Sequence, residues 1–147
     1  MRLWHYKLLP YLPKSQLIAQ WRELNSIFKK QDRHILINYI YEYNKKDLGI
    51  YSNMVIQEML SRGIKINNWK NYEEYFKYET FEFPEMFEYK PFKNHHNNRY
   101  LLQCFYNLQE KYDRGQKDFD IETFKELVMF VDVEINDHCE LLLNLRG

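Results

Sequence analysis

Apolar side chains recur every three or four residues in four stretches of the chain, which is the period of an amphipathic helix. The first stretch carries Leu17, Trp21, Leu24 and Phe28. Pro13 precedes it and suits a first helical turn, where its missing N–H costs no intrahelical hydrogen bond. On this helix Gln16, Gln20 and Glu23 share one side next to the apolar stripe. The pattern therefore predicts that Glu23 lies at the edge of the core.

The second stretch carries the apolar stripe Leu48, Tyr51, Val55 and Met59. Asp47 is its expected N-cap, because a short acidic side chain can accept hydrogen bonds from the first free backbone N–H groups. Gly63 follows Arg62 and is a natural left-handed stop. The sequence thus predicts a helix that ends at about residue 62.

The third and fourth stretches lie in the second half of the chain. The third carries Leu101, Cys104, Phe105, Leu108 and Tyr112. It should end near Gly115. The fourth begins after Asp118 or Asp120 and carries Ile121, Phe124, Leu127, Val128 and Val131. It either continues into the apolar run at 139–145 or breaks before it.

Two regions lack a clear helical period. In residues 34–44, Ile35, Ile37, Tyr39, Tyr41 and Tyr43 alternate like a strand, yet three of them also share a helical face, so both interpretations stay open. Residues 64–96 form a long aromatic and acidic connection, which we expect to wrap around the helices. Only 4 Gly and 4 Pro interrupt the chain, which favours long helices. We expect an all-α, compact single-domain fold over residues 1–147 with this long irregular connection.

Composition supports a folded globular protein. The chain has 147 residues, 45% of them hydrophobic and 29% charged, which is enough for one core. No apolar run approaches the roughly 20 residues that span a bilayer, and the N-terminus lacks the features of a secretory signal. We therefore expect a cytoplasmic protein that does not bind membranes and keeps Met1. Cys104 and Cys139 are expected to remain reduced thiols.

The formal charge is zero, but it is unevenly distributed. Residues 1–71 hold 12 Lys and Arg against 5 Asp and Glu, whereas residues 72–147 hold 9 against 16. Such an asymmetry gives a neutral chain a basic face that attracts phosphates, or it is simply an uneven solvated surface. Charge alone does not decide between the two.

The chain terminus itself is a possible reactive group. An α-amino group has a reference pKa of about 7.7 to 8.0, so about a tenth of it is an unprotonated nucleophile at pH 7. Amines attack electrophilic carbon to form Schiff bases, and a nearby carboxylate such as Glu23 can move the protons. Arg2 and Arg22 could meet phosphates on either side of a sugar.

Three sequence segments carry a resemblance to a known family. They are MRLWHYKLLPYLPKSQLIAQWREL, RHILINYIYEYN and LGIYSNMVIQEMLSRGIKI, the last with the E-x-x-x-RG pattern at Glu58, Arg62 and Gly63. The chain resembles the pyrimidine-dimer DNA glycosylases, the phage endonuclease V group with its bacterial relatives. The resemblance is strongest over residues 1–67, and beyond them only HHNNRYLLQCFYNLQEKYDRG is similar to a later helix of that fold.

The resemblance implies a fold and a mechanism. Members of this family are helical and compact, cut the glycosidic bond of a damaged pyrimidine with an α-amino nucleophile, and then break the strand by β-elimination. It implies the amine of Met1 as nucleophile and Glu23 as the essential carboxylate. It also implies DNA-binding roles for Arg2, Gln16, Arg22, Arg33 and His34. We expect damaged double-stranded DNA as the partner, a monomer, and no cofactor or metal.

The chain departs from the family pattern in three ways. Arg2 is too large for ordinary methionine removal, so Met1 should carry the amine. Ser26 stands where a second basic residue is expected. The acidic second half lacks a basic aromatic tail. These departures leave the lyase chemistry in place and bear on which lesion is recognised.

Other interpretations stay open beside this one. Glu23 could be a solvated helix residue paired with Lys30 or Arg22, and His34 could be a hydrogen-bonded residue at a helix start. A metal site at His95 and His96 has no supporting ligand spacing. A rival from another class is a non-catalytic nucleic-acid-binding or scaffold protein that keeps the fold. A carboxylate-dependent hydrolase lacks the paired acids that it needs.

Overall fold

The computed structural model describes residues 1–80 and 89–146, with side chains described as far as residue 136. These ranges contain helices and no strand, which confirms the predicted all-α class. The elements in chain order are η1 (Tyr6–Tyr11), α1 (Lys14–Lys30), η2 (Asn38–Glu42), α2 (Lys45–Ser61), α3 (Lys70–Tyr75), α5 (Asn98–Asp113) and α6 (Ile121–Arg146). No helix in the described ranges is long and apolar enough to cross a membrane.

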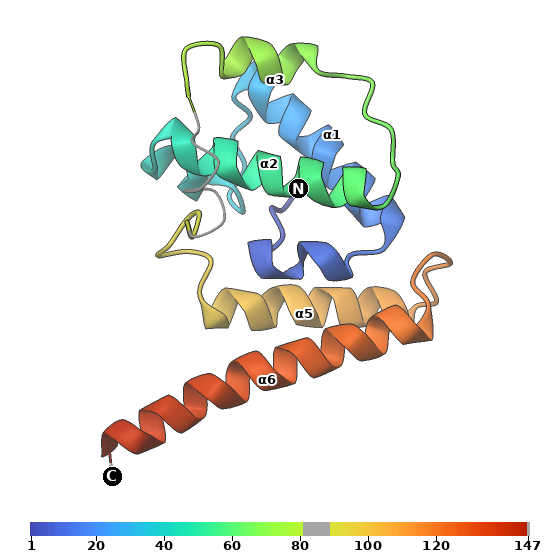
Figure 1. The fold of residues 1–147 in the computed structure, drawn as a ribbon, viewed down its shortest axis with the longest axis vertical. Helices are drawn as coiled ribbons and strands as arrows, with labels where there is room; N and C mark the ends of the chain where they lie inside the picture. The colour runs from blue at the N-terminus through green and yellow to red at the C-terminus, as the bar shows by residue number, and fades with distance from the viewer. Residues whose placement is uncertain (81–88, 147) are drawn as a thin grey trace.

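The short 3-10 helix η1 lies between two groups of helices. Figure 1 shows α1, α2 and α3 on one side of it and α5 and α6 on the other. Helix α1 packs against α2 and α3, α5 packs against α6, and η1 contacts α2, α5 and α6. The segment Tyr6–Tyr11 therefore packs between the two groups of helices.

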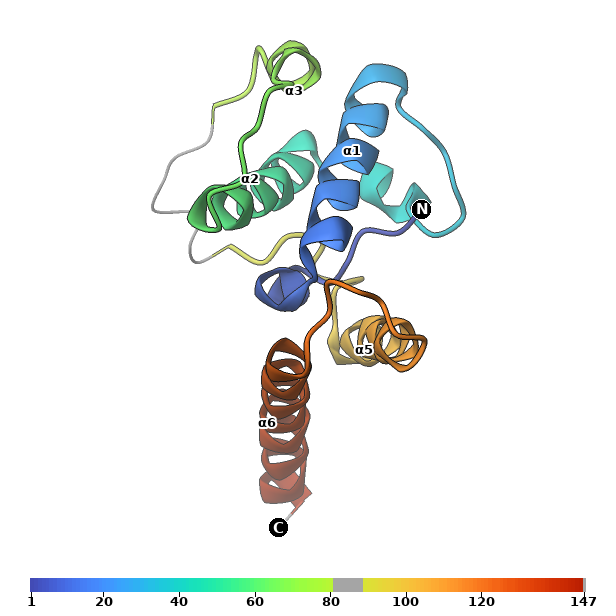
Figure 2. The ribbon, with the colours of Figure 1, turned by 90° about the vertical axis from the view of Figure 1, so that its right-hand side faces the viewer.

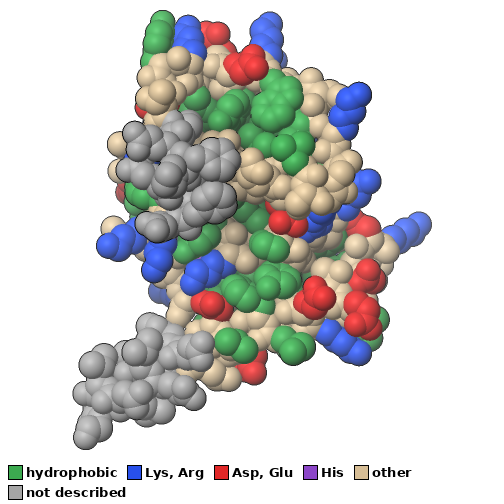
Figure 3. Space-filling view, viewed as in Figure 1, with side chains coloured by type: hydrophobic (Ala, Val, Ile, Leu, Met, Phe, Trp, Pro, Cys, Tyr) green, Lys and Arg blue, Asp and Glu red, His purple; other side chains and the backbone are tan. Residues whose placement is uncertain are grey.

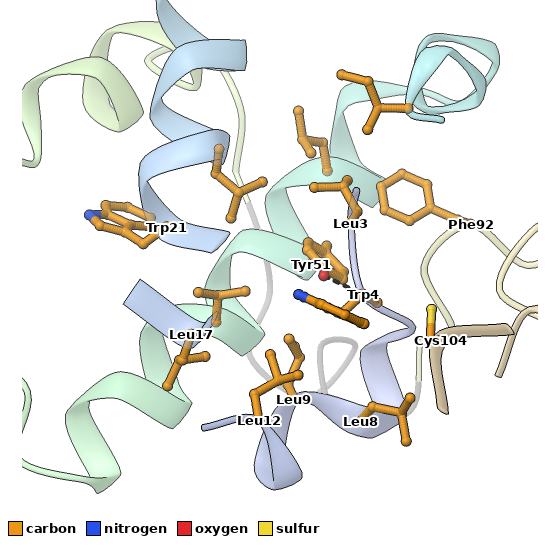
Figure 4. Packing of buried hydrophobic residues seen from close by; sticks show 14 of the residues in the cluster. Leu3, Trp4, Leu8, Leu9, Leu12, Leu17, Trp21, Tyr51, Phe92 and Cys104 are labelled. Atoms are coloured by element: carbon orange, nitrogen blue, oxygen red, sulfur yellow. Dashed lines mark hydrogen bonds between the residues drawn. The ribbon is translucent and has the colours of Figure 1, made fainter. Parts of the chain in front are cut away.

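Five of the first twelve residues, Leu3, Trp4, Leu8, Leu9 and Leu12, are part of the hydrophobic core. Leu3 is fully buried and Trp4 nearly so, and Figure 4 shows both among side chains of α1 and α2. The Tyr51 hydroxyl of α2 donates to the Trp4 carbonyl oxygen at 2.7 Å. The Tyr100 hydroxyl of α5 donates to the Leu3 carbonyl oxygen. Burying a leucine stabilises a fold by about 2 kcal/mol, so this segment is firmly held and fixes where Met1 lies.

The apolar stripes predicted for α1 and α2 are confirmed. The buried residues of the two helices include Leu17, Trp21, Leu24, Phe28, Leu48, Tyr51, Val55 and Met59. Helix α2 ends as predicted, with Gly63 at a φ of +72°. The Ile64 N–H donates to the Met59 carbonyl oxygen at 2.9 Å, and the Gly63 N–H donates to that of Leu60 at 3.0 Å. This is the Schellman arrangement, which satisfies the last carbonyls of the helix.

The predicted cap of α2 is wrong. Asn44 is the N-cap, and its side chain accepts from the Lys46 N–H at 2.7 Å. Asp47 lies in the first turn and is buried. Its carboxylate accepts from the Tyr89 hydroxyl at 2.7 Å and from the Phe92 N–H at 2.8 Å. Asn and Asp are both favoured as N-caps. Asp47 does not cap the helix because it accepts hydrogen bonds from the buried donors of Tyr89 and Phe92 instead.

The two ambiguous regions resolve differently. Residues 35–37 form a turn that leads into the 3-10 helix η2, so neither the strand nor the α-helix interpretation of residues 34–44 holds. Within residues 64–96 the short helix α3 was not predicted. It packs against α1 through aromatic rings, with Trp21 and Trp69 centroids 6.0 Å apart and those of Phe28 and Phe76 5.3 Å apart. Residues 81–88 of that connection lie outside the described ranges.

Helices α5 and α6 agree with the sequence pattern. Gly115 follows α5 with a φ of +82°, and the Asp120 carboxylate caps α6 by accepting from the Thr123 N–H at 2.7 Å. Helix α6 continues to Arg146, so it does not break before residue 139. Only part of its predicted stripe is buried, since Ile121 and Val128 are exposed whereas Leu127 and Val131 lie in the core.

Candidate active site

A small polar cavity of about 220 Å³ opens beside the N-terminus. Figure 2 shows the N-terminus, the loop after α1, and α5 on the same side of the molecule. The lining side chains come from these three parts and from α1: Met1, Arg2, Trp4, Gln16, Ala19, Gln20, Glu23, Leu36, Asn107 and Lys111. The cavity is smaller than the roughly 300–1,000 Å³ of sites for drug-sized ligands, which suits a sugar better than a whole nucleotide.

One buried side chain, Gln20, ties the N-terminal segment to Glu23. Its Oε1 accepts from the Trp4 N–H at 2.8 Å. Its Nε2 donates to the Arg2 carbonyl oxygen at 3.1 Å and to Glu23 Oε2 at 3.2 Å. Gln20 and Glu23 stand three residues apart, so they share a face of α1. The helix period places Gln20 and Glu23 together, and the hydrogen bonds of Gln20 place the carboxylate beside the start of the chain.

The charge of Glu23 depends on this environment. Burial raises the pKa of its carboxyl group above the ordinary value. The positive charge of the Met1 α-amino group is the largest of the opposing effects, followed by a hydrogen bond from the Arg2 backbone. The charge of Arg22 and the Gln20 amide lower the pKa further. A half-buried carboxyl group with a raised pKa, within the field of an amine, is suited to proton transfer.

The predicted site residues fall into two groups. Four of them, Met1, Arg2, Gln16 and Glu23, line the cavity. Met1 as a whole residue is 37% exposed. Met1 and Glu23, for which the family resemblance implies the catalytic roles, thus line one cavity.

The other three predicted residues do not line the cavity. Arg22 is exposed and acts on Glu23 through its charge. The Arg33 guanidinium carbon lies 4.3 Å from the centre of the Tyr41 ring. His34 is also exposed, and its Nδ1 accepts from the Leu36 N–H at 3.2 Å. His34 is hydrogen-bonded, as one interpretation of the sequence expected, but it precedes a turn and not the start of a helix.

Sequence reasoning missed the contributions of α5 and of the loop. Asn107 and Lys111 line the cavity from a helix that lies outside the segments of strongest resemblance. They are four residues apart and therefore on one face of α5. The spacing could have been read from the sequence, but nothing in it indicated that this face meets the N-terminus. Leu36 reaches the cavity from the loop after α1.

Two histidines hold the N-terminal segment against the second half of the chain. The His96 Nδ1 accepts from the Tyr6 N–H at 3.2 Å, and the His5 Nδ1 accepts from the Lys7 N–H at 3.1 Å. Each ring is therefore a neutral tautomer that carries its proton on Nε2. The His5 Nε2 then donates to the His96 carbonyl oxygen at 3.0 Å. Burial lowers the pKa of His5 to about 4 and that of His96 well below its ordinary value.

The adjacent histidines have different partners. His95 Nδ1 lies 2.7 Å from the Tyr43 hydroxyl, whereas His96 Nε2 lies 2.7 Å from that of Tyr39. Among the residues whose side chains are described, no three His, Cys, Asp or Glu residues are arranged to hold a metal ion. Of the two cysteines, Cys104 is a buried free thiol, and the side chain of Cys139 is outside the described part.

A second and larger cavity, of about 690 Å³, lies between η1, α2 and α6. Hydrophobic side chains gather on the face that Figure 3 shows. The rings of Tyr11 and Phe130, which both line the larger cavity, stack with centroids 5.0 Å apart. Its charged groups include Lys7 and Glu134, which are paired with each other at 2.9 Å. This cavity is larger and more apolar, but the groups suited to proton transfer meet in the smaller one.

Comparison with known proteins identifies the family. The model for the family described as pyrimidine dimer DNA glycosylase matches residues 1–72. No curated protein and no solved structure matches the chain. The family match supports a general role as an enzyme, a DNA glycosylase whose substrate is damaged DNA. Residues 1–72, just under half of the chain, match the pyrimidine dimer DNA glycosylase family.

Proposed function

We propose that the protein is a DNA glycosylase with an associated abasic-site lyase activity, in which the α-amino group of Met1 is the nucleophile and Glu23 transfers protons. One observation carries the proposal. The start of the chain and a carboxyl group with a raised pKa line the same cavity, and the amine is the strongest of the groups that stabilise the carboxylate form.

The proposed reaction begins at the sugar. The lone pair of the amine nitrogen forms a bond to C1′ while the glycosidic bond breaks, and the base leaves with the bonding electrons and takes up a proton. The Glu23 carboxylate accepts a proton from the attacking nitrogen and returns one to O4′ as the ring opens, which gives an imine between Met1 and C1′. No metal or cofactor enters this step.

Strand cleavage follows from the imine. Removal of a proton from C2′ expels the phosphate on C3′ by β-elimination, because the imine withdraws the electrons of the C2′–H bond. Water then hydrolyses the imine, which frees the sugar fragment and restores the Met1 amine. A carboxyl group beside the amine is placed to shuttle protons in each of these steps.

The surrounding residues have proposed roles in holding DNA. Arg2, Gln16 and Lys111 line the cavity, and the exposed Arg22 and Arg33 stand on the basic first half of the chain. Arginine and lysine side chains hold phosphates on either side of a site. His34 is proposed to shape the loop through its hydrogen bond to Leu36. We also propose that the chain acts as one domain, since α1 and α5 both line the cavity.

Trapping of the imine tests the proposal. Native protein incubated with duplex DNA that carries an abasic site, in the presence of borohydride, should form a stable covalent complex. A protein extended by Gly-Ser before Met1 should form at least 100-fold less, because its amine no longer reaches the sugar. Circular dichroism should show the same helicity for both proteins.

The rival interpretation makes the opposite prediction. A non-catalytic nucleic-acid-binding protein would bind the abasic duplex but give no trapped complex. Equal trapping by the native and extended proteins would mean that a lysine, and not the terminus, is the nucleophile. Lys111 lines the cavity and would be the first candidate.

A further inference from the structure

The loop between α1 and η2 carries two consecutive exposed aliphatic residues near its end. Ile35 is 85% exposed and Leu36 is 40% exposed. Turns normally carry Gly, Asn, Asp, Ser or Pro, so two consecutive large aliphatic side chains at a turn are unusual. Leu36 also lines the small cavity that holds Met1 and Glu23. We name Ile35 and Leu36 the apolar tip.

The loop is built to hold the apolar tip in one position. Next to the tip, Ile37 is fully buried and anchors the loop in the core. The Ile37 N–H donates to the His34 carbonyl oxygen at 2.8 Å, and the His34 N–H donates to Asn38 Oδ1 at 2.8 Å. The Leu36 N–H donates to His34 Nδ1. A tip with these constraints loses little entropy when it inserts into a partner.

Positive charges stand close to the tip in the chain. Lys29, Lys30 and Arg33 are all exposed, and they lie within six residues of Ile35. The Arg33 guanidinium lies over the Tyr41 ring. The hydroxyl of the same tyrosine donates to the Asp32 carbonyl oxygen. Leu36 also shares the small cavity with Arg2 and Lys111. An aliphatic tip with cations nearby fits a duplex, in which phosphates surround an apolar base stack.

We propose that Ile35 and Leu36 form a wedge that enters the base stack of duplex DNA beside the lesion. The wedge fills the space from which a nucleotide has moved and holds the opened sugar against the cavity. Aliphatic wedges between base steps unstack and kink a duplex in this way, and a target must leave the stack before its sugar and base can be reached. This inference rests on the proposed function for its substrate, but not on the amine chemistry.

The test uses a duplex that cannot react with an amine. A tetrahydrofuran residue replaces the abasic sugar, and 2-aminopurine, whose fluorescence rises when it unstacks, stands next to it. Binding is followed separately by anisotropy. The variant Ile35→Ala/Leu36→Ala is compared with native protein, and Leu60→Ala serves as the matched control because Leu60 is an aliphatic residue that is 50% exposed on α2.

Saturating native protein and Leu60→Ala should each raise the fluorescence at least about threefold, and Ile35→Ala/Leu36→Ala should give less than half of that rise. Equal rises for all three proteins, or no rise with bound native protein, would overturn the wedge. Failure of native protein to bind the duplex would overturn the wedge and the proposed substrate together. A tip-dependent rise in a protein that gives no borohydride-trapped complex would leave the wedge standing and remove only the proposed amine chemistry.

Discussion

Two cavities in the described part of the chain lie towards opposite ends of the N-terminal segment. Met1, Arg2 and Trp4 line the smaller cavity, and Tyr6 to Tyr11 contribute to the wall of the larger one. The larger has a volume of about 690 Å³ and the smaller about 220 Å³. Volume and apolar character would favour the larger as a ligand site.

The chemistry favours the smaller cavity. It brings together the chain terminus, a carboxyl group whose pKa is raised by burial, and a lysine from another helix. In the larger cavity Lys7 and Glu134 neutralise each other. The difference teaches that perturbed, convergent titratable groups indicate a reactive site better than size does. The family match over residues 1–72 covers the half of the chain that supplies both Met1 and Glu23.

The largest expected effect comes from comparing DNA cleavage by two variants, each with one substitution in one of the two cavities. Glu23→Gln keeps the side-chain volume but removes the proton-transfer group, so cleavage of abasic duplex DNA in a single turnover should slow by about a thousandfold. Glu134→Gln, the matched control in the larger cavity, should stay within about twofold of native protein. If the two variants slowed cleavage equally, the assignment of chemistry to the smaller cavity would be wrong.

Acid should weaken the contact between the N-terminal segment and the second half of the chain, which His5 and His96 make. His5 and His96 are neutral in the fold because burial lowers their pKa values, to about 4 for His5. The unfolded chain binds protons at these residues below about pH 6.5, so stability is lost as the pH falls from 6.5 towards 4. His5 alone predicts a loss of about 2 kcal/mol in unfolding free energy between pH 7 and pH 5.

Urea unfolding at the two pH values measures this loss. Protonation of Glu23, whose pKa is raised in the fold, acts in the opposite direction and makes the net loss smaller. The exposed His34 provides a control, since His34→Ala should retain the same difference between pH 7 and pH 5. Equal stability at both pH values would contradict the neutral, buried histidine pair.

A smaller effect is expected from the part of the smaller cavity that α5 supplies. Lys111→Ala should weaken binding to abasic duplex DNA by about tenfold at low salt. It should also reduce the slope of log K against log salt concentration by about one, which corresponds to the loss of one phosphate contact. Lys117→Ala removes an exposed lysine after α5 and should change binding by less than about twofold. Binding isotherms at several salt concentrations give both quantities. An unchanged salt slope for Lys111→Ala would exclude a phosphate contact there.

The smallest effect is expected from partly filling the larger cavity. Met54 lines it, and Met54→Phe adds a ring to an apolar wall that holds no reacting group. Cleavage of abasic DNA should remain within about twofold of native protein, and the melting temperature should change by a few degrees at most. A tenfold loss of cleavage would mean that the larger cavity takes part in the reaction.

The parts of the site on α1 could be predicted because helix periodicity is a local property. The stripe from Leu17 to Phe28 fixes which side of α1 faces the core, and Gln20 and Glu23 then fall at its edge. The link from Gln20 to the Trp4 N–H could not be predicted. It depends on the path of the N-terminal segment between α1 and α2, which no short sequence pattern encodes.

The errors in the sequence-based fold also have physical causes. Asn44 and Asp47 are both good caps, and the buried donors of Tyr89 and Phe92 gave Asp47 another role. Helix α3 has 6 residues, too few to show a period. It forms where its aromatic rings can pack on α1. The contribution of Lys111 depends on how α5 docks, which tertiary packing determines and local propensity does not.

The most direct test of the central claim locates the atom that bonds to DNA. The complex trapped by borohydride on abasic duplex DNA can be digested with nuclease and protease, and mass spectrometry then finds the peptide that carries the sugar remnant. The account predicts the remnant on the α-nitrogen of Met1, in the peptide that begins the chain. A remnant on Lys111, or on any other lysine, would contradict it.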